Sequence, residues 1–355
     1  MPPTPFAAAL DLLAPYLPDV LVGARERAQL HACLRWLPFD LAVYWGVECR
    51  LAAYAPQVDV QLCVAQGAPG HDWLASTTPE YGPGPVLLAH PAWQRLRHFA
   101  QLWAAGQLPP APHLWLGFDL APGVPMPLPL IHVRTDQLQI DAAPHVLAPL
   151  LAEQWTPGLA ASLERALTAA PQMPVYMGCL LARQNPAVRV TQLIAIPDAV
   201  AYLRRIGWPG ELARVRDLLD PVSMWTTHVG LSLNIGAEVQ PYLGLEMLNW
   251  TLPPAPRASW RSCLNTLVAR GLCTPAKQDA LLAYPGLAPV PPPDGYGEEP
   301  AGNAVYTMAR NLLHIKLALL ADHEIEAKAY LDVHQGWLQL GPLHPARTAQ
   351  ISHSL

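Results

Sequence analysis

The chain has 355 residues, which is long for one domain, but 52% of them are hydrophobic and only 14% are charged, so one large core is feasible. Its 41 prolines and 23 glycines favour many short elements and argue against extensive disorder. The formal net charge of -5 provides no basic footprint, so a nucleic-acid backbone is excluded as a leading partner.

In chain order, the pattern predicts β-hairpins that alternate with helices. We expect two helices over residues 5–37, a first hairpin over 47–66, a Gly/Pro-rich loop over 67–85 and a helix over 90–105. The second hairpin covers 114–134 and the third 175–196, with helical sequence over 144–170 between them. A helix pair over 198–219 leads to the fourth hairpin, 228–248. The fifth hairpin, 314–333, follows helices over 257–270 and 275–284, a loop over 286–302 and a short helix around 305–311.

Each hairpin has at least one arm in which polar and apolar residues alternate, which is typical of strands whose faces meet different surroundings. Ten antiparallel strands of this kind can close into a barrel, which removes the edge strands and turns the polar faces toward a lumen. We therefore predict an α+β fold. It is a ten-stranded antiparallel β-barrel built from five ββαα repeats with helices on the outside, in one domain over residues 1–340 with a tail over 341–355.

The cysteines and the N-terminal residues indicate a location inside the cell. The six cysteines lie scattered without a CxxC pair, which favours reduced and buried thiols over a disulfide framework: Cys33, Cys49, Cys63, Cys179, Cys263 and Cys273. Residues 1–21 have no basic stretch and include Asp11 and Asp19, so we expect no secretion signal. Because no uncharged apolar run reaches roughly 18 residues, we expect no membrane insertion and a cytoplasmic protein.

Several polar residues of the hairpins could bind an anion in the lumen. Lys316 and Lys328, on the two arms of hairpin five, could converge on a phosphate, with hydrogen bonds from His314 and Gln240. Tyr242 follows Gln240 by two residues, and Tyr330 follows Lys328 in the same way, so each has a polar neighbour on its own face. Such rings can shield a developing carbocation. Glu48 and Glu246 are carboxylates on the same kind of polar face, and Glu48 could accept an N–H or O–H proton.

Simpler interpretations remain open at this point. A lysine or tyrosine on a strand often faces solvent, and Glu48 could form a surface ion pair with Arg50 or Arg35. The histidines show no metal spacing, so we expect no metal site. There is no P-loop, no GxGxxG after a strand and no GxSxG, which leaves nucleotide-binding and hydrolase functions without their usual parts. We expect packing roles for Trp115, Trp250 and Trp260.

Four short motifs accompany the five repeats: Gly46-Val47-Glu48-Cys49-Arg50, Phe118-Asp119-Leu120, Glu238-Val239-Gln240-Pro241-Tyr242 and Lys328-Ala329-Tyr330-Leu331. With them, residues 40–335 resemble the ABBA-type aromatic prenyltransferases, whose fold is the PT barrel, and in particular the dimethylallyl-tryptophan synthase branch. The resemblance implies that Glu48 binds an indole N–H and that Gln240 contacts a diphosphate. That family carries basic residues in hairpins one to three, where this chain has Gln61, Leu128-Pro129-Leu130 and Met177-Gly178; Arg134 and Arg189 are the candidates to compensate.

The residues and the resemblance together predict a metal-independent prenyltransferase of natural-product biosynthesis. It would move an isoprenoid from its diphosphate to an electron-rich acceptor, an indole, a tryptophan or a peptide, with no cofactor. The expected diphosphate-binding residues are Lys316, Lys328, Gln240, His314 and Arg189, and Glu246 is a further substrate-binding candidate. Tyr242 and Tyr330 would shield the allyl cation, and Glu48 would orient the acceptor and help to remove its proton.

Two alternatives keep the same barrel. In the first, Glu48, Asp119, Glu246 and the histidines carry out acid–base chemistry, such as a cyclisation, on a bound natural product. In the second, the barrel holds a peptide or metabolite without chemistry, and a lumen filled by side chains would favour that function. The acceptor, the isoprenoid length, the regiochemistry and the oligomeric state do not follow from the sequence.

Overall fold

The predicted barrel is confirmed. The computed structural model describes residues 4–52, 56–78, 81–120, 126–183, 185–248, 256–293, 304–321 and 324–339, so Trp250 and the predicted tail over 341–355 lie outside the described residues. One antiparallel sheet contains ten long strands and the short β9. The strands are β1 (Tyr44–Arg50), β2 (Val58–Ala65), β3 (His113–Phe118), β4 (Pro129–Arg134), β5 (Tyr176–Leu180), β6 (Asn185–Ala195), β7 (His228–Ile235), β8 (Val239–Leu248), β9 (Gly286–Pro289), β10 (Ala304–Leu319) and β11 (Ile325–Gln339).

The sheet closes because β11 pairs with both β10 and β1. The order is β11-β1-β2-β3-β4-β5-β6-β7-β8-β10, with the additional pairing of β10 with β11. At the closure Lys328 of β11 lies opposite Arg50 of β1 on one side and opposite Lys316 of β10 on the other. Side chains from the beginning and from the end of the chain therefore share one row on the inner face of the barrel.

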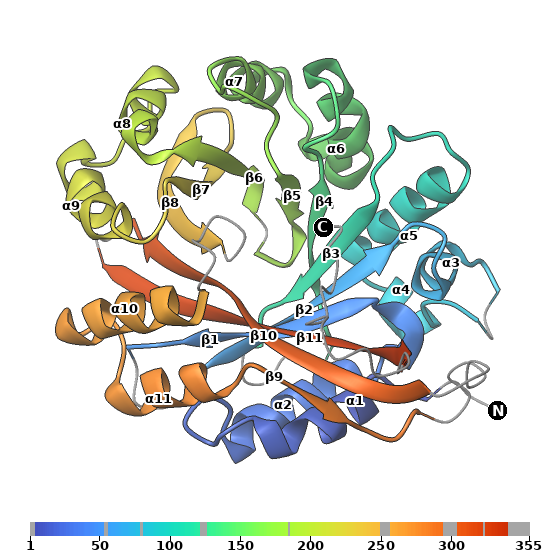
Figure 1. The fold of residues 1–355 in the computed structure, drawn as a ribbon. Coiled ribbons are helices and arrows are strands. Elements are labelled where there is room, and N and C mark those ends of the chain that lie inside the picture. Colours follow the sequence, from blue (N-terminus) through green and yellow to red (C-terminus); the bar gives the residue numbers. More distant parts are fainter. Residues whose placement is uncertain are drawn as a thin grey trace.

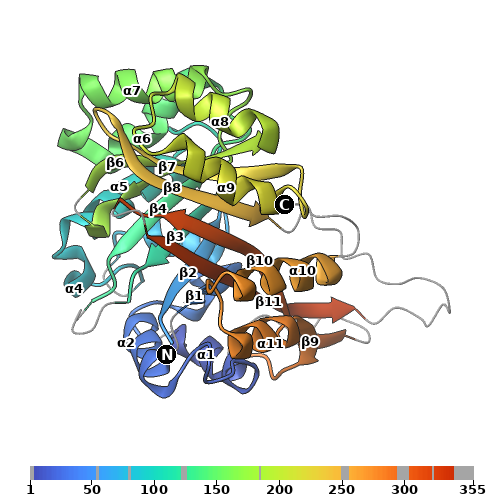
Figure 2. The same ribbon diagram turned by 90° about the vertical axis from the view of Figure 1, so that its left-hand side faces the viewer.

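The described helices cover the outer face of the barrel (Figure 1). Viewed at 90°, α7 and α8 lie at one side of the molecule and α1, α2 and α11 at the opposite side (Figure 2). The helices are α1 (Ala7–Leu13), α2 (Ala24–Leu34), α3 (Pro69–Ala75), α4 (Pro85–Leu88), α5 (Pro91–Ala104), α6 (Ala143–Leu151), α7 (Pro157–Thr168), α8 (Ile196–Arg205), α9 (Leu212–Val222), α10 (Pro256–Ala269) and α11 (Pro275–Ala283).

Local sequence explains where the helices begin. Thr156 caps α7 by accepting a hydrogen bond from the backbone N–H of Leu159 at 3.3 Å, and Thr274 caps α11 in the same way through Lys277 at 3.3 Å. A proline follows each of these caps at the first helical position, where its missing N–H costs nothing. These helices pack on outward strand residues such as those of β7, which are fully buried: Val229, Leu231, Leu233 and Ile235.

Two predicted elements near the fifth hairpin are wrong. The short helix around 305–311 is the first half of β10, which runs from Ala304 to Leu319 and pairs with β11 along nearly its whole length. The predicted loop over 286–302 begins with β9, which pairs with the same part of β10. A bulge at Leu313 shifts the register between Leu312 and His314, so even-numbered side chains face outward before the bulge and inward after it.

The structure also describes the state of the cysteines and the character of the helices. All six cysteines are free and buried. None of the described helices combines the length and the apolar character that crossing a membrane requires.

Candidate functional site

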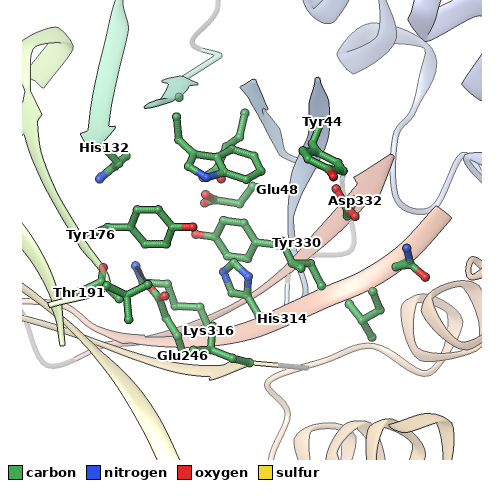
Figure 3. Close-up of a pocket in the computed structure, with 18 of the residues that line it drawn as sticks. Tyr44, Glu48, His132, Tyr176, Thr191, Glu246, His314, Lys316, Tyr330 and Asp332 are labelled. Atoms are coloured by element: carbon green, nitrogen blue, oxygen red, sulfur yellow. Dashed lines mark hydrogen bonds and ion pairs between the residues drawn. The ribbon is translucent and has the colours of Figure 1, made fainter. Parts of the chain in front are cut away.

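The interior of the barrel is a cavity of about 1480 Å³, to which all ten long strands contribute side chains. Typical ligand pockets measure about 300–1,000 Å³, so this space can hold two reactants together. Figure 3 shows side chains of β1, β4, β5, β6, β8, β10 and β11 pointing into one common space. The lumen is therefore not filled by side chains, which was the arrangement expected of a barrel without chemistry.

Glycines keep this space open. Five strand glycines lie directly opposite cavity-lining residues in the register: Gly46, Gly117, Gly178, Gly230 and Gly244. A Cβ on Gly244 would lie 2.3 Å from Cε of Lys316 and 3.0 Å from Cβ of Ser232. Only glycine lets the long side chain of Lys316 cross over this strand.

Lys316 is fixed by two partners in the cavity wall. Its Nζ donates to Glu246 Oε1 at 2.8 Å and to Ser232 Oγ at 3.0 Å. Burial would raise the pKa of Glu246, but the charge of Lys316 and the neighbouring His314 hold that pKa below its usual value. Glu246 is therefore an anion that positions Lys316.

Glu48 and Lys328 belong to a second group of charges, nearer the hairpin turns. Glu48 lies 3.0 Å from Nζ of Lys328 and 3.4 Å from Nη1 of Arg50. Burial would raise the pKa of Glu48, but Lys328, Arg50 and a hydrogen bond from Tyr330 lower it well below its usual range. Glu326 also pairs with Lys328, at 2.8 Å. Glu48 is thus ionised and bonded to Arg50 on its own strand and to Lys328 and Tyr330 on the neighbouring β11.

Arg189 differs from both lysines in its partners. It is 8% exposed, its Nε donates to Asn234 Oδ1 at 2.9 Å, and in the described part of the chain no carboxylate lies within ion-pair distance of it. Its guanidinium lies 4.4 Å from the ring centre of Tyr242, and Nζ of Lys316 lies 5.7 Å from the same centre. Burial would raise the pKa of Tyr242, but Lys316 and Arg189 lower it below its usual value. Two cations of the cavity wall, Arg189 and Lys316, therefore lie close to one tyrosine ring.

Tyr330 and His314 form a stacked pair in the cavity wall. Their rings are 3.8 Å apart at 18°. Burial lowers the pKa of His314 to about 4, with Lys316 adding to the effect, so His314 is neutral at neutral pH. His132, across the cavity, has a pKa of about 3 because of burial and the charge of Arg189. The histidines of the cavity therefore act as neutral hydrogen-bonding groups.

The structure brings together most of the residues selected from sequence. Glu48, Arg189, Glu246, His314, Lys316 and Tyr330 line the cavity. Gln240 lies apart from it, since its amide exchanges hydrogen bonds of 3.0 and 3.1 Å with the amide of Asn185. No described group of three or more His, Cys, Asp or Glu side chains could hold a metal ion.

Sequence reasoning missed several cavity residues. Trp115 and Trp260, for which packing roles were expected, also line the space, and Trp260 is at the same time part of the buried hydrophobic core. Arg183 forms a bidentate ion pair with Asp119, both contacts at 2.7 Å. Asp332 also lines the cavity, and its position two residues after Tyr330 was the available signal.

Solved structures of aromatic prenyltransferases share this fold. The apo form of prenyltransferase PriB matches with a TM-score of 0.55 and 13% identity, over 92% of this chain and 96% of that chain. A 6-dimethylallyltryptophan synthase from Micromonospora olivasterospora, in complex with DMASPP and Trp, matches with a TM-score of 0.52 and 14% identity, over 92% and 97%. Another 6-dimethylallyl tryptophan synthase matches with a TM-score of 0.52 and 14% identity, over 93% of this chain and 97% of that chain. No family model and no curated protein matches the sequence. The likeness establishes the class of fold, the barrel of the aromatic prenyltransferases.

Proposed function

We propose that the protein is an aromatic prenyltransferase that moves an isoprenoid from its diphosphate onto an electron-rich aromatic acceptor. The observation that carries this proposal is a large cavity whose wall holds Arg189 and Lys316, both close to the ring of Tyr242, together with the Tyr330–His314 stack. Cations and aromatic rings side by side suit a ligand with an anionic head and an allylic tail. The named neighbour in complex with DMASPP and Trp supports the same two classes of ligand.

Arg189 is the proposed first contact of the diphosphate, because its two terminal nitrogens have no carboxylate to satisfy within the described residues. Lys316 and Lys328 already hold Glu246 and Glu48, but an ammonium group has three donors and can bind a phosphate oxygen in addition. Bonds from fixed cations stabilise the diphosphate as it leaves, which lowers the barrier to breaking the carbon–oxygen bond. His314 can add a neutral hydrogen bond.

The allyl cation needs an aromatic face and protection from water. One face of Tyr330 is covered by the neutral ring of His314, which leaves the other face for a cation. Tyr242 already has a guanidinium near its ring, so we propose that Tyr330 is the main shield and that Tyr242 orders the two cations. Glu48 remains the proposed hydrogen-bond acceptor for the N–H of the aromatic acceptor, and its low pKa suits binding better than proton removal.

The test is incubation with dimethylallyl or geranyl diphosphate and with tryptophan, tryptamine or tryptophan-containing peptides, followed by mass spectrometry of the products. We expect a prenylated acceptor and a loss of at least tenfold in kcat/KM for the diphosphate in Arg189→Gln. Arg204→Gln, on the exposed surface of α8, is the matched control and should retain activity. Absence of both product and diphosphate binding in the wild type would refute the proposal.

The acid–base alternative is less well supported. Glu48 and Glu246 are both held ionised by neighbouring lysines, so neither can donate a proton near neutral pH. If Glu246→Gln abolished turnover of a bound natural product while Lys328→Ala retained it, acid–base chemistry would replace prenyl transfer. The free, buried thiols support a reducing compartment, and we propose a cytoplasmic location.

A further inference from the structure

Asp332 differs from the other acidic residues of the barrel interior. Six carboxylates in or beside the cavity pair with a cation: Glu48 and Glu326 with Lys328, Asp59 with Arg50, Asp119 with Arg183, Asp136 with Arg134, and Glu246 with Lys316. Asp332 has no such cation among the described residues. Its hydrogen bonds come from the side chain of Asn311 and from the backbone N–H of Val333.

The register directs Asp332 into the cavity. It lies on β11 two residues after Tyr330, on the same face, and opposite Gly46 of β1. On its other side it faces Asn311 of β10. Because Gly46 has no side chain, the carboxylate is open to the cavity, of which it is a lining residue. Two residues along a strand span about 7 Å, so one ligand can contact both Tyr330 and Asp332.

Two tyrosines lie beside this carboxylate (Figure 3). Tyr44 points toward Asp332 from β1, and Tyr330 lies on the other side (Figure 3). The ring of Tyr44 packs against that of His334 at 4.9 Å and 36°, which fixes its position at this end of the cavity. A carboxylate among aromatic faces is the combination that attracts an organic ammonium ion. Burial raises the pKa of Asp332 to about 6, so a bound cation would relieve the cost of its charge.

The two described arginines at this end of the barrel are directed away from Asp332, because Arg310 lies on the opposite face of β10 from Asn311 and Arg134 has a carboxylate partner. Arg310 precedes Asn311, but its guanidinium lies 3.8 Å from the ring centre of Tyr16 and 5.7 Å from that of Tyr284. Arg134 pairs with Asp136 at 2.9 Å. A ligand with a carboxylate beside its amine would bring a second negative charge next to Asp332, whereas among the described residues no lysine or arginine pairs with Asp332 itself.

We propose that Asp332, Asn311 and Tyr44 form a subsite for a protonated amine, and that its ligand is an aromatic compound whose ammonium group has no carboxylate on the neighbouring carbon. Arylalkylamines belong to this class, whereas a free aromatic amino acid does not. The amine subsite stands on the contacts of Asp332 alone. Only the identification of its ligand as the prenyl acceptor rests on the proposed function.

Binding measured by calorimetry, with the full chain and without any diphosphate, tests the subsite separately from prenyl transfer. The probes are tryptamine, the neutral 3-ethylindole and zwitterionic L-tryptophan. We expect the wild type to bind tryptamine about tenfold more tightly than either of the others, as one charge-assisted hydrogen bond provides. In Asp332→Asn the affinity for tryptamine should fall about tenfold, while that for 3-ethylindole changes less than twofold.

Asp72→Asn, an exposed site on α3, is the control for an equal change in net charge and should bind all three compounds as the wild type does. Equal affinity of the wild type for the three probes, or binding of none, would overturn the inference even if tryptophan were prenylated. Amine selectivity without any prenyl transfer would keep the subsite and reject the proposed function. The wild-type series is decisive even if Asp332→Asn does not fold.

Discussion

Replacing Asp332 by asparagine should stabilise the protein at high pH. Burial raises the pKa of this carboxyl from its ordinary 3.8 to about 6, so the folded chain favours the protonated form more than the unfolded chain does. That contribution to stability is fully present below pH 4 and is lost as the pH rises through 6. At pH 8 the wild type carries a poorly solvated charge that Asp332→Asn lacks. The variant should therefore be more stable there, with equal stability below pH 4.

The magnitude follows from the shift of about 2 pKa units, which corresponds to about 3 kcal/mol, and water in the cavity reduces it to about 2 kcal/mol. Several groups lie close to Asp332. Burial raises the pKa values of Tyr44, Cys63 and Tyr284, so these groups stay neutral across this range. Arg310 lies on the neighbouring strand, and His334 packs on Tyr44, so the contribution of His334 must be separated from that of Asp332.

The assay is urea denaturation at pH 8, 6.5 and 4, followed by far-UV circular dichroism. The difference between variant and wild type should shrink steadily as the pH falls, and Asp72→Asn should show no such trend. The same series in a His334→Gln background separates the contribution of His334 from that of Asp332. If Asp332→Asn were less stable than the wild type at pH 8, or if the difference did not depend on pH, the carboxylate would have a stabilising partner and the reasoning would fail.

Three further predictions concern Lys316 and Arg189, the two cations close to the ring of Tyr242. Lys316→Met leaves Glu246 buried without its cation and should lower the free energy of unfolding by about 3–5 kcal/mol in urea titrations. Adding Glu246→Gln should recover much of that loss. If the effects of the two substitutions on the free energy of unfolding were strictly additive, the ion pair would be contradicted. Gly244→Ala places a methyl group 2.3 Å from Cε of Lys316, so we expect about 1–3 kcal/mol of destabilisation. The variant should also bind inorganic pyrophosphate more weakly. Unchanged binding would show that Lys316 makes no contact with pyrophosphate. Arg189→Lys keeps the charge but loses the planar group over Tyr242, so pyrophosphate affinity measured by calorimetry should fall about tenfold; full retention would show that charge alone is sufficient.

The barrel could be predicted because its signal is local. Alternation along hairpin four predicted a polar face that includes Glu246, and Glu246 lines the cavity of the closed barrel. The failure around residues 305–311 has a physical cause, because a strand in this segment is specified by its partners in β9 and β11 rather than by its own residues. The bulge at Leu313 is likewise a property of the pairing.

The chemistry of the cavity was harder to predict than its location. Lys316 and Lys328 were selected for their charge, but the sequence does not show that Glu246 and Glu48 already engage them. Those contacts depend on which residues face one another across strands distant in sequence. Asp332 was overlooked for the same reason, since a carboxylate can be recognised as unpaired only after every neighbouring pair is placed.

The closure of the barrel by β1 and β11 has a consequence for biosynthesis. Arg50 and Glu326, which bond across that seam, are separated by 276 positions, so β1 emerges from the ribosome long before its neighbour has been translated. During that interval its unpaired edge and the apolar outer face of the nascent sheet are open to wrong partners. Such long-range pairing also slows folding. Protection of the growing chain by chaperones should therefore improve the yield of folded protein, and it matters most before the final strand is released.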